Sequence, residues 1–436
     1  MAQHEAAVGE RADGGVNPPP TPDGSTDPDA RPAADAGSGR ALTPLMLISL
    51  ALLAGVAPFG TDLYLPAFPS MVTDLSTSTS GVQLSLTAFL IGAGLGQLIF
   101  GPLSDRIGRR GPLIVGMALY VISGIAAAIA PSIAVLIIAR LAQGMTGSAG
   151  MVIGRAMIAD VARGRQAARA MSTMMTVAGV APVVAPITGG LFADSIGWRG
   201  LLWIVAALAL ISLIAAVMFL PETHGRRVRD ADPQAQHGTG LRSLANRTYV
   251  GHTMAMVFSF ATMMAYISAS PFLYQDMMGF SSLQYSMAFA INATGIVACT
   301  AISARLVARI EPRRLARIGM ITNLIASVAV LVLAVSGLPA ILIAVPLFFA
   351  IAPLGLVYGN NTALALDAAR HNAGLASAVL GTSQFALAGL VSPLVGLAGE
   401  HTAVPLGIVM VTAAVIAQIG FLIATGRRGR AAVQST

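Results

Sequence analysis

The chain has 436 residues, of which 55% are hydrophobic and only 10% charged, and its mean hydropathy is +0.76. An average soluble domain carries about 25% charged residues, so this composition excludes an ordinary soluble protein and indicates a membrane protein. The formal net charge of +7 could suit nucleic acid, but the arginines occupy short loops between apolar segments, which is the pattern of membrane topology.

Residues 1–40 differ from the rest of the chain. They are rich in proline, glycine, alanine and aspartate, which predicts a disordered tail. No basic segment followed by an apolar core is present there, so we do not expect a signal peptide.

Long apolar segments, separated by mostly short polar loops, make up the rest of the chain. About 20 residues are needed for each helical crossing, and these segments are too long and continuous for barrel strands, so the sequence predicts an all-α membrane protein. The predicted spans are residues 42–65, 82–102, 112–130, 132–158, 170–192, 199–220, 248–274, 283–304, 315–335, 339–366, 373–398 and 402–425.

The longest polar interruption lies after the sixth predicted span. It separates six spans from six and therefore predicts two helical bundles joined by a central loop. The predicted divisions are a tail at 1–40, a six-helix bundle at 41–220, a central loop at 221–247, a second bundle at 248–425 and a tail at 426–436.

Arginine placement predicts the orientation. Alternate loops hold nearly all arginines of the membrane region, whereas the opposite loops hold only Arg199. By the positive-inside rule the arginine-rich loops, both tails and the central loop are cytoplasmic, in the cell inner (cytoplasmic) membrane. The arginine-rich set comprises Arg106, Arg109, Arg110, Arg163, Arg165, Arg169, Arg226, Arg227, Arg229, Arg242, Arg247, Arg305, Arg309, Arg313, Arg314, Arg317, Arg370, Arg427, Arg428 and Arg430.

The two halves resemble each other weakly. Three pairs of residues recur at offsets of 205 to 207 residues, which favours a parallel repeat of two six-span units. The pairs are Pro66 and Pro271, Asp160 and Asp367, and Pro186 and Pro393.

The loop between the second and third predicted spans reads Gly-Pro-Leu-Ser-Asp-Arg-Ile-Gly-Arg-Arg-Gly-Pro from residue 101. It resembles the signature loop of the major facilitator superfamily, G-x-L-x-D-R-x-G-R-R/K. The resemblance implies that superfamily's fold, with 12 transmembrane helices in two pseudo-symmetric bundles. It also implies a conformational latch for the outward-facing state, in which Asp105 meets the start of the eleventh span. The residues assigned to the latch are Gly101, Asp105, Arg106, Gly108, Arg109, Arg110 and Asp160.

Arg140 is a charged residue inside a predicted span, roughly 12 Å from its start at 1.5 Å per residue. A charge there normally faces a cavity or a partner. Arg140-x-x-Gln143-Gly144 resembles a motif of the drug/proton antiporters, which implies a part in proton coupling. The alternative is a structural arginine that binds backbone carbonyls.

Asp62 is the natural partner of Arg140. The segment from Phe59 to Pro69 resembles the "DMYLPALP" signature of the Bcr/CflA branch of multidrug exporters. Burial in an apolar cavity favours protonation of a carboxylate and a nearby arginine opposes it, so Asp62 is predicted to bind the coupling proton. The alternative is a carboxylate at headgroup level.

Residues 179–190 resemble the antiporter motif of exporters, although the chain has Ala185-Pro186 where the family usually has Gly-Pro. Proline bends a helix, and paired glycines allow close helix contact. The resemblance implies export rather than uptake, through Gly179, Pro182, Pro186, Gly189 and Gly190.

A substrate cavity is expected between the halves near the middle of the membrane. Few charges are available there, which suits a lipophilic, cationic or neutral substrate. The predicted substrate-binding residues are Tyr64, Gln97, Gln143, Tyr266, Asn292, Tyr358, Asn361 and Gln384.

The sequence therefore predicts proton-coupled efflux of drug-like compounds by alternating access. The alternative is an exporter of one metabolite, such as an amino acid, a sugar or a self-made antibiotic. No P-loop and no histidine pair with metal-ligand spacing occur, so no enzyme activity, metal or cofactor is predicted. The family default is a monomer.

Overall fold

The computed structural model describes residues 43–162, 164–223, 244–369, 373–396, 399 and 401–426. Every regular element within these residues is a helix, as predicted. The predicted tails and most of the predicted central loop lie outside the described residues. So do the predicted topology arginines Arg163, Arg226, Arg227, Arg229, Arg242, Arg370, Arg427, Arg428 and Arg430.

The N-terminal half, residues 43–223, begins with a well-capped helix. Thr43 accepts a hydrogen bond from the backbone N–H of Met46, and proline occupies the first helical position. Its elements are α1 (Pro44–Asp62), η1 (Leu65–Ala67), α2 (Phe68–Asp74), α3 (Thr79–Ile107), α4 (Arg110–Ala128), α5 (Ile133–Val161) and α6 (Gly164–Phe219).

The C-terminal half, residues 244–426, also contains a well-capped helix. Ser281 and Gln284 form a reciprocal capping box at the start of α8. Its elements are α7 (Arg247–Phe272), η5 (Leu273–Met277), α8 (Ser282–Leu306), α9 (Pro312–Val335), η6 (Ala340–Ile343), α10 (Ala344–Ile351), α11 (Leu354–Asp367), α12 (Ala373–Val391), η8 (Ser392–Gly396) and α13 (Val404–Thr425).

Eleven helical segments among the described residues are long and apolar enough to cross a membrane. One of them, Arg169–Phe219, has 51 residues, about twice the length that one crossing requires. Gly197 breaks it with φ 64° and ψ −179°, a backbone conformation that favours glycine. The break divides the segment into the predicted fifth and sixth spans, and the twelve predicted spans are thereby accounted for.

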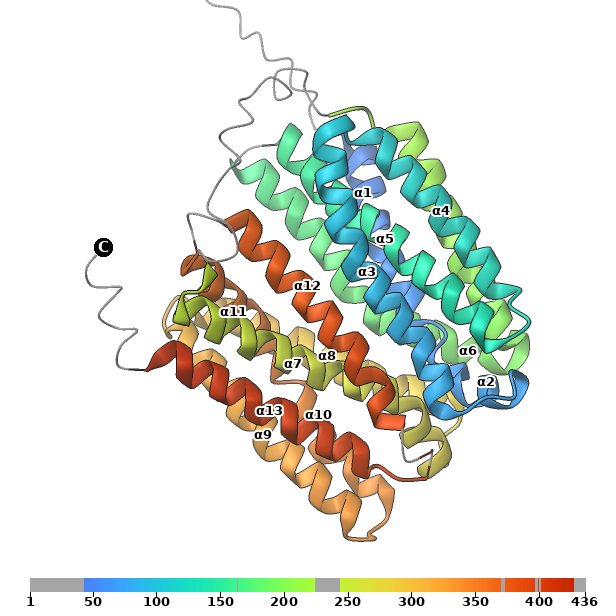
Figure 1. Ribbon diagram of the computed structural model, residues 1–436, viewed down its shortest axis with the longest axis vertical. Coiled ribbons are helices and arrows are strands. Elements are labelled where there is room, and N and C mark those ends of the chain that lie inside the picture. The colour runs from blue at the N-terminus through green and yellow to red at the C-terminus, as the bar shows by residue number, and fades with distance from the viewer. Residues whose placement is uncertain are drawn as a thin grey trace, which may run out of the picture. The chain divides into compact units, whose positions relative to one another are not determined.

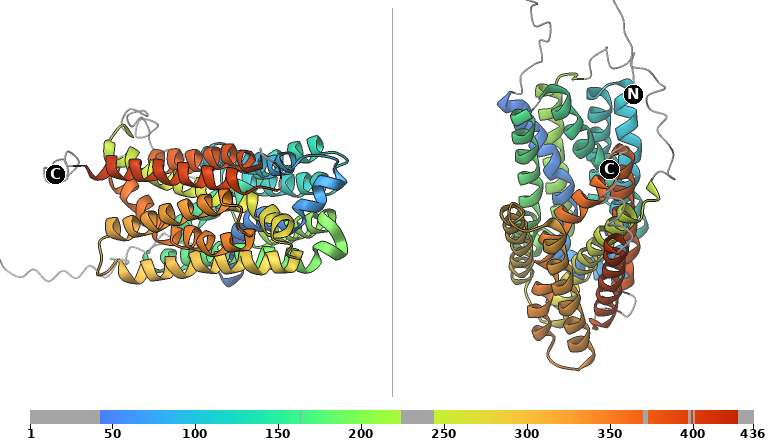
Figure 2. Two further views of the ribbon diagram at one scale, coloured as in Figure 1. Left: turned by 90° about the horizontal axis from the view of Figure 1, so that it is seen from below. Right: turned by 90° about the vertical axis from the view of Figure 1, so that its left-hand side faces the viewer.

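Helices α1–α6 pack mainly against one another, and so do α7–α13 (Figures 1 and 2). In the first group α1 packs on α6, and α3 packs on α5. In the second group α13 packs on α7 and α9. The halves contact each other chiefly through α6 with α8 and α3 with α12.

The helices have one arginine-rich end and one opposite end. The arginine-rich face, where α3 ends and α4 begins, carries Arg106, Arg109 and Arg110. Side chains of the two halves hydrogen-bond near the opposite face, and we call these contacts the opposite-face seam. They are Gln83 Nε2 to the Ser268 carbonyl at 3.1 Å, Gln275 Nε2 to the Pro66 carbonyl at 2.9 Å, and Ser282 Oγ to Asp194 Oδ1 at 2.9 Å.

Candidate functional site

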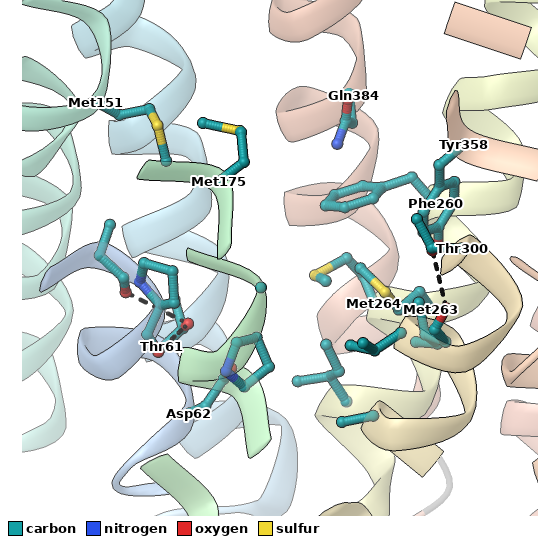
Figure 3. Close-up of a pocket in the computed structure, with 18 of the residues that line it drawn as sticks. Thr61, Asp62, Met151, Met175, Phe260, Met263, Met264, Thr300, Tyr358 and Gln384 are labelled. Carbon is teal, nitrogen blue, oxygen red and sulfur yellow. Dashed lines mark hydrogen bonds between the residues drawn. The ribbon is translucent and has the colours of Figure 1, made fainter. Parts of the chain in front are cut away.

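A cavity of about 900 Å³ lies between the two halves (Figure 3). Helices α1, α3, α5 and α6 form one wall, and α7, α8, α11 and α12 form the other. The lining reaches from Asp62, at the end of α1, to Ser172 and Ala304, which lie toward the arginine-rich ends of α6 and α8. Its volume falls within the range of sites that hold drug-sized ligands.

The cavity wall is mostly apolar and rich in sulfur. Asp62 is the charged side chain among its described lining residues. Methionine adapts to ligands of different shape because its unbranched side chain is flexible and polarisable. The methionines on the wall are Met151, Met175, Met256, Met263 and Met264.

Asp62 is the last residue of α1 and is only 4% exposed. Its position on the cavity wall is visible in Figure 3, beside Thr61 and across from Met263 and Met264. The structure therefore places Asp62 on the wall of the inter-half cavity.

Arg140 is fully buried in α5 and bound within the N-terminal half. Its Nη2 donates to the Gly60 carbonyl and its Nη1 to Gln143 Oε1, both at 2.7 Å. Its guanidinium carbon lies 4.4 Å from the ring centroid of Tyr64 and 4.6 Å from that of Phe89.

Asp62 and Arg140, the two predicted proton-coupling residues, are both described and are not in direct contact. No ion pair within 4.0 Å joins them, yet they are close enough to interact electrostatically. Arg140 instead has the geometry of the structural alternative, since it binds a backbone carbonyl.

Four of the eight predicted substrate residues lie on the cavity wall: Gln97, Tyr266, Tyr358 and Gln384. They come from both halves, on α3, α7, α11 and α12. The phenol oxygens of the two tyrosines are themselves buried, and the described residues offer them no hydrogen-bond partner within the distance limit.

The other four lie off the wall because their polar groups bind inside the bundles. The Tyr64 hydroxyl lies 3.1 Å from Ser85 Oγ, and Gln143 accepts from Arg140. Asn292 Nδ2 donates to the Ala288 carbonyl at 2.9 Å, and Asn361 Oδ1 lies 2.9 Å from His252 Nδ1. In this conformation these side chains support the helices rather than face the cavity.

The predicted latch residues gather around Arg109 in the N-terminal half. Arg109 Nε donates to Asp160 Oδ2 at 2.9 Å, and its Nη1 donates to Ser104 Oγ at 2.9 Å and to Asp105. Burial alone would lower the pKa of the Arg109 guanidinium, but the bonds with Asp160 and Asp105 outweigh burial and raise that pKa.

Other parts of the predicted latch have different surroundings. Gly108 has φ +104°, which favours glycine, and Gly101 packs beside Val152. Arg106 is exposed, and Arg110 donates to the Val217 carbonyl at 2.8 Å. Residues 370–372, which precede the eleventh span and its expected contact with Asp105, lie outside the described part of the chain.

Glu222 was not predicted as a site residue, since it falls in the predicted central loop. Its Oε1 accepts from the Arg109 backbone N–H at 2.9 Å and its Oε2 from the Arg110 backbone N–H at 3.1 Å. Thr223 donates to Asp160 at 3.1 Å. The sequence did contain a signal for this contact, because an acidic residue directly follows a predicted span on the same face as the start of α4. The N-terminus of a helix attracts an anion.

Some residues of the predicted antiporter motif line the cavity, and others lie at contacts between helices. Gly179 and Pro182 line the cavity, and Pro186 lies within α6. Gly189 packs against the Leu63 carbonyl of α1's end. Gly190 faces Ser282 and Ser286 of α8, so it lies where the halves touch.

Comparison with known proteins identifies the family. Residues 50–393 match the model of the Major Facilitator Superfamily. The chain belongs to this superfamily. Among the described residues no group of three or more histidine, cysteine, aspartate or glutamate side chains is placed to hold a metal ion.

Two relatives and one solved structure extend this result. The chain is 37% identical to an uncharacterized MFS-type transporter of Bacillus subtilis (strain 168), over 87% of this chain and 95% of the relative. It is 26% identical to the bicyclomycin resistance protein homolog of Haemophilus influenzae, over 88% and 97%. A D-xylose-proton symporter has a TM-score of 0.70 at 19% identity, over 88% of this chain and 100% of that one, which shows the shared fold.

These relationships indicate a transporter rather than an enzyme. They are consistent with the resemblance to the drug/proton antiporters and their Bcr/CflA branch, on which the sequence analysis relied.

Proposed function

We propose that this superfamily member exports lipophilic, cationic drug-like compounds in exchange for protons, as a monomer. The observation that carries the proposal is that Asp62 is the one carboxylate among the described lining residues of a large apolar and methionine-rich cavity. An organic cation supplies both the positive charge and the apolar surface that such a wall favours, and it leaves no buried charge unpaired.

Asp62 is the coupling group in this proposal. A protonated carboxyl has lost its attraction for a cation, so proton and substrate compete for one site. Arg140 holds the adjacent turn of α1 and adds a fixed positive charge nearby. Each proton that moves inward gains about 2.3 kcal/mol per 100 mV of membrane potential.

The arrangement of the two faces supports loading from the cytoplasm. The seam joins the halves near the opposite face, while the cavity lining extends toward the arginine-rich ends of α6 and α8. The positive-inside rule makes the arginine-rich face cytoplasmic. Export then requires the seam to open and the arginine-rich side to close. The named resistance relative of Haemophilus influenzae supports the direction of transport.

The test is ethidium efflux from energised cells, with and without a protonophore. We expect wild type to export the dye, and both the protonophore and Asp62→Asn to abolish export in well-expressed protein. Asp74→Asn is the matched control because Asp74 accepts from Trp198 Nε1 at the opposite face, away from the cavity, and asparagine keeps an acceptor.

The other outcomes separate the alternatives. Protonophore-sensitive efflux that survives Asp62→Asn moves the proton site elsewhere. Absence of dye export from well-expressed wild type contradicts multidrug export and favours an exporter of one metabolite.

A further inference from the structure

Two carboxamides face the cavity, one from each half. Gln97 lies on α3 and Gln384 on α12, and both side chains are partly exposed. Neither has a hydrogen-bond partner among the described residues. Each carboxamide offers two N–H donors and one carbonyl acceptor, so the two side chains can form several hydrogen bonds with a ligand.

The other polar groups of the wall have less to offer. The Thr61, Thr176 and Thr300 hydroxyls already donate to carbonyls of their own helices at 2.8 to 3.4 Å. The Tyr266 and Tyr358 hydroxyl oxygens are buried, so a ligand does not reach them in this conformation. Ser148 Oγ donates to the Met145 carbonyl at 2.8 Å, and the Ser172 hydroxyl is exposed on the wall. Gln97 and Gln384 are the carboxamides of the described wall, and each can donate and accept.

The two glutamines lie where α3 and α12 pack against each other. Three contacts join α3 to α12 in succession toward the arginine-rich face. A Cβ atom placed on Gly389 would lie 2.6 Å from Ile91 Cγ1, one on Gly94 would lie 3.2 Å from Phe385 Cβ, and one on Gly381 would lie 3.4 Å from Gln97 Oε1. Of the three contacts, that between Gln97 and Gly381 is nearest to the arginine-rich face, and Gln384 lies about one helical turn from Gly381.

We propose that Gln97 and Gln384 together bind an uncharged polar group of the substrate, such as a carboxamide, while Asp62 binds its cationic end. The substrate class is a lipophilic cation that carries a hydrogen-bonding group at a distance from its charge. This inference rests on the proposed function and specifies which cations are preferred.

Binding to both glutamines has a mechanical consequence. A ligand group bonded to α3 and α12 at once bridges the two halves. It therefore binds more tightly when the arginine-rich side closes, and this differential affinity drives closure. Cations that lack the polar group gain nothing from the bridge.

The test compares two probes on purified protein in lipid nanodiscs. One is tetraphenylphosphonium, which has no hydrogen-bonding group, and the other is (4-carbamoylphenyl)triphenylphosphonium, which adds one carboxamide. Affinities come from competition with radiolabelled tetraphenylphosphonium. We expect wild type to bind the carbamoyl probe about fivefold more tightly, the factor that corresponds to one net hydrogen bond.

The variants are Gln97→Leu and Gln384→Leu, each of which should bring the ratio of the two affinities to about one while tetraphenylphosphonium binding persists. Gln418→Leu is the matched control, because Gln418 lies on α13 and is not on the cavity wall, so it should keep the wild-type ratio.

The possible results of this experiment either support or overturn the proposed glutamine site. A ratio unchanged by both leucine substitutions overturns the site, and a ratio changed by only one overturns the bridge between halves. Wild type that binds no tetraphenylphosphonium, or Asp62→Asn that binds it as well as wild type, contradicts the proposed cation site itself and the inference with it.

Discussion

Arg140 donates to the carbonyl of Gly60, two residues before the cavity carboxylate, at 2.7 Å. Carbonyls in the last turn of a helix lack partners within that helix, and the helix dipole places negative charge there. A buried guanidinium satisfies both needs at the end of α1. Arg140 thus fixes the turn that carries Asp62 while leaving the carboxylate free to face the cavity.

The first prediction concerns Arg140→Lys. An ammonium group does not reproduce the two hydrogen bonds of Arg140 or its flat packing on two aromatic rings. We expect the free energy of unfolding to fall by roughly 2–4 kcal/mol, seen as a lower thermal midpoint of the purified protein, and efflux to fall with it. Arg314→Lys is the control, since that side chain is 74% exposed and should change little. An unaltered midpoint for Arg140→Lys would contradict the structural role.

A second prediction is the pH dependence of cation binding. Protonation of Asp62 removes the negative charge, so the affinity for tetraphenylphosphonium should fall as pH falls. The loss should approach tenfold per pH unit once Asp62 is mostly protonated, as for one competing proton. Asp62 is the charged side chain among the described residues of the cavity wall, so the change is assigned to it. Asp62→Asn should flatten the profile. A profile equally steep in that variant would assign the titration to another group.

Glu222→Ala provides a third prediction. The Glu222 carboxylate accepts two backbone N–H groups at the start of α4, which connects the end of α6 to the Arg109 cluster. Its loss should reduce stability by about 1–2 kcal/mol, as for other helix caps, and Glu222→Gln should cost less because one acceptor remains. Thermal unfolding of the purified variants measures the effect. Glu311→Ala is the control, because its pair with Arg314 is largely exposed. Equal midpoints for Glu222→Ala and Glu311→Ala would count against the cap.

Hydropathy and arginine spacing were sufficient to predict the helices, because both are local properties of the chain. The fifth and sixth spans were predicted as separate helices, and Gly197 marks the break between them. Glu222 was missed because its partners, the backbone N–H groups of Arg109 and Arg110, are more than 100 residues away.

The site was harder to predict than the fold. Residue type placed Tyr64, Gln143, Asn292 and Asn361 among the candidates, but type does not reveal whether a polar side chain faces the cavity or a neighbouring helix. Helix rotation decides this, and it depends on packing between both halves. Asp62 and Gln97 satisfied the sequence criteria and also lie on the wall. The roles proposed for them remain predictions.

The last prediction tests the closed seam through Gly190. A Cβ atom on this glycine would lie 2.6 Å from the Ser282 carbonyl of α8, and backbone does not yield as a flexible side chain does. Gly190→Leu should therefore push α6 away from α8 and favour the conformation that is open at the opposite face. In a Cys299→Ala background, a cysteine at position 269, next to the seam, should react several times faster with an impermeant maleimide added outside.

A reciprocal measurement separates this shift from general unfolding. Thr176 is exposed on the cavity wall toward the arginine-rich face, so a cysteine there should react more slowly in the Gly190→Leu protein. Gly359→Leu is the control, because nothing lies within 4 Å of a Cβ atom on that glycine. Faster labelling at both positions would indicate loosened packing, whereas opposite changes would mean that one glycine contact sets the balance between the two open states.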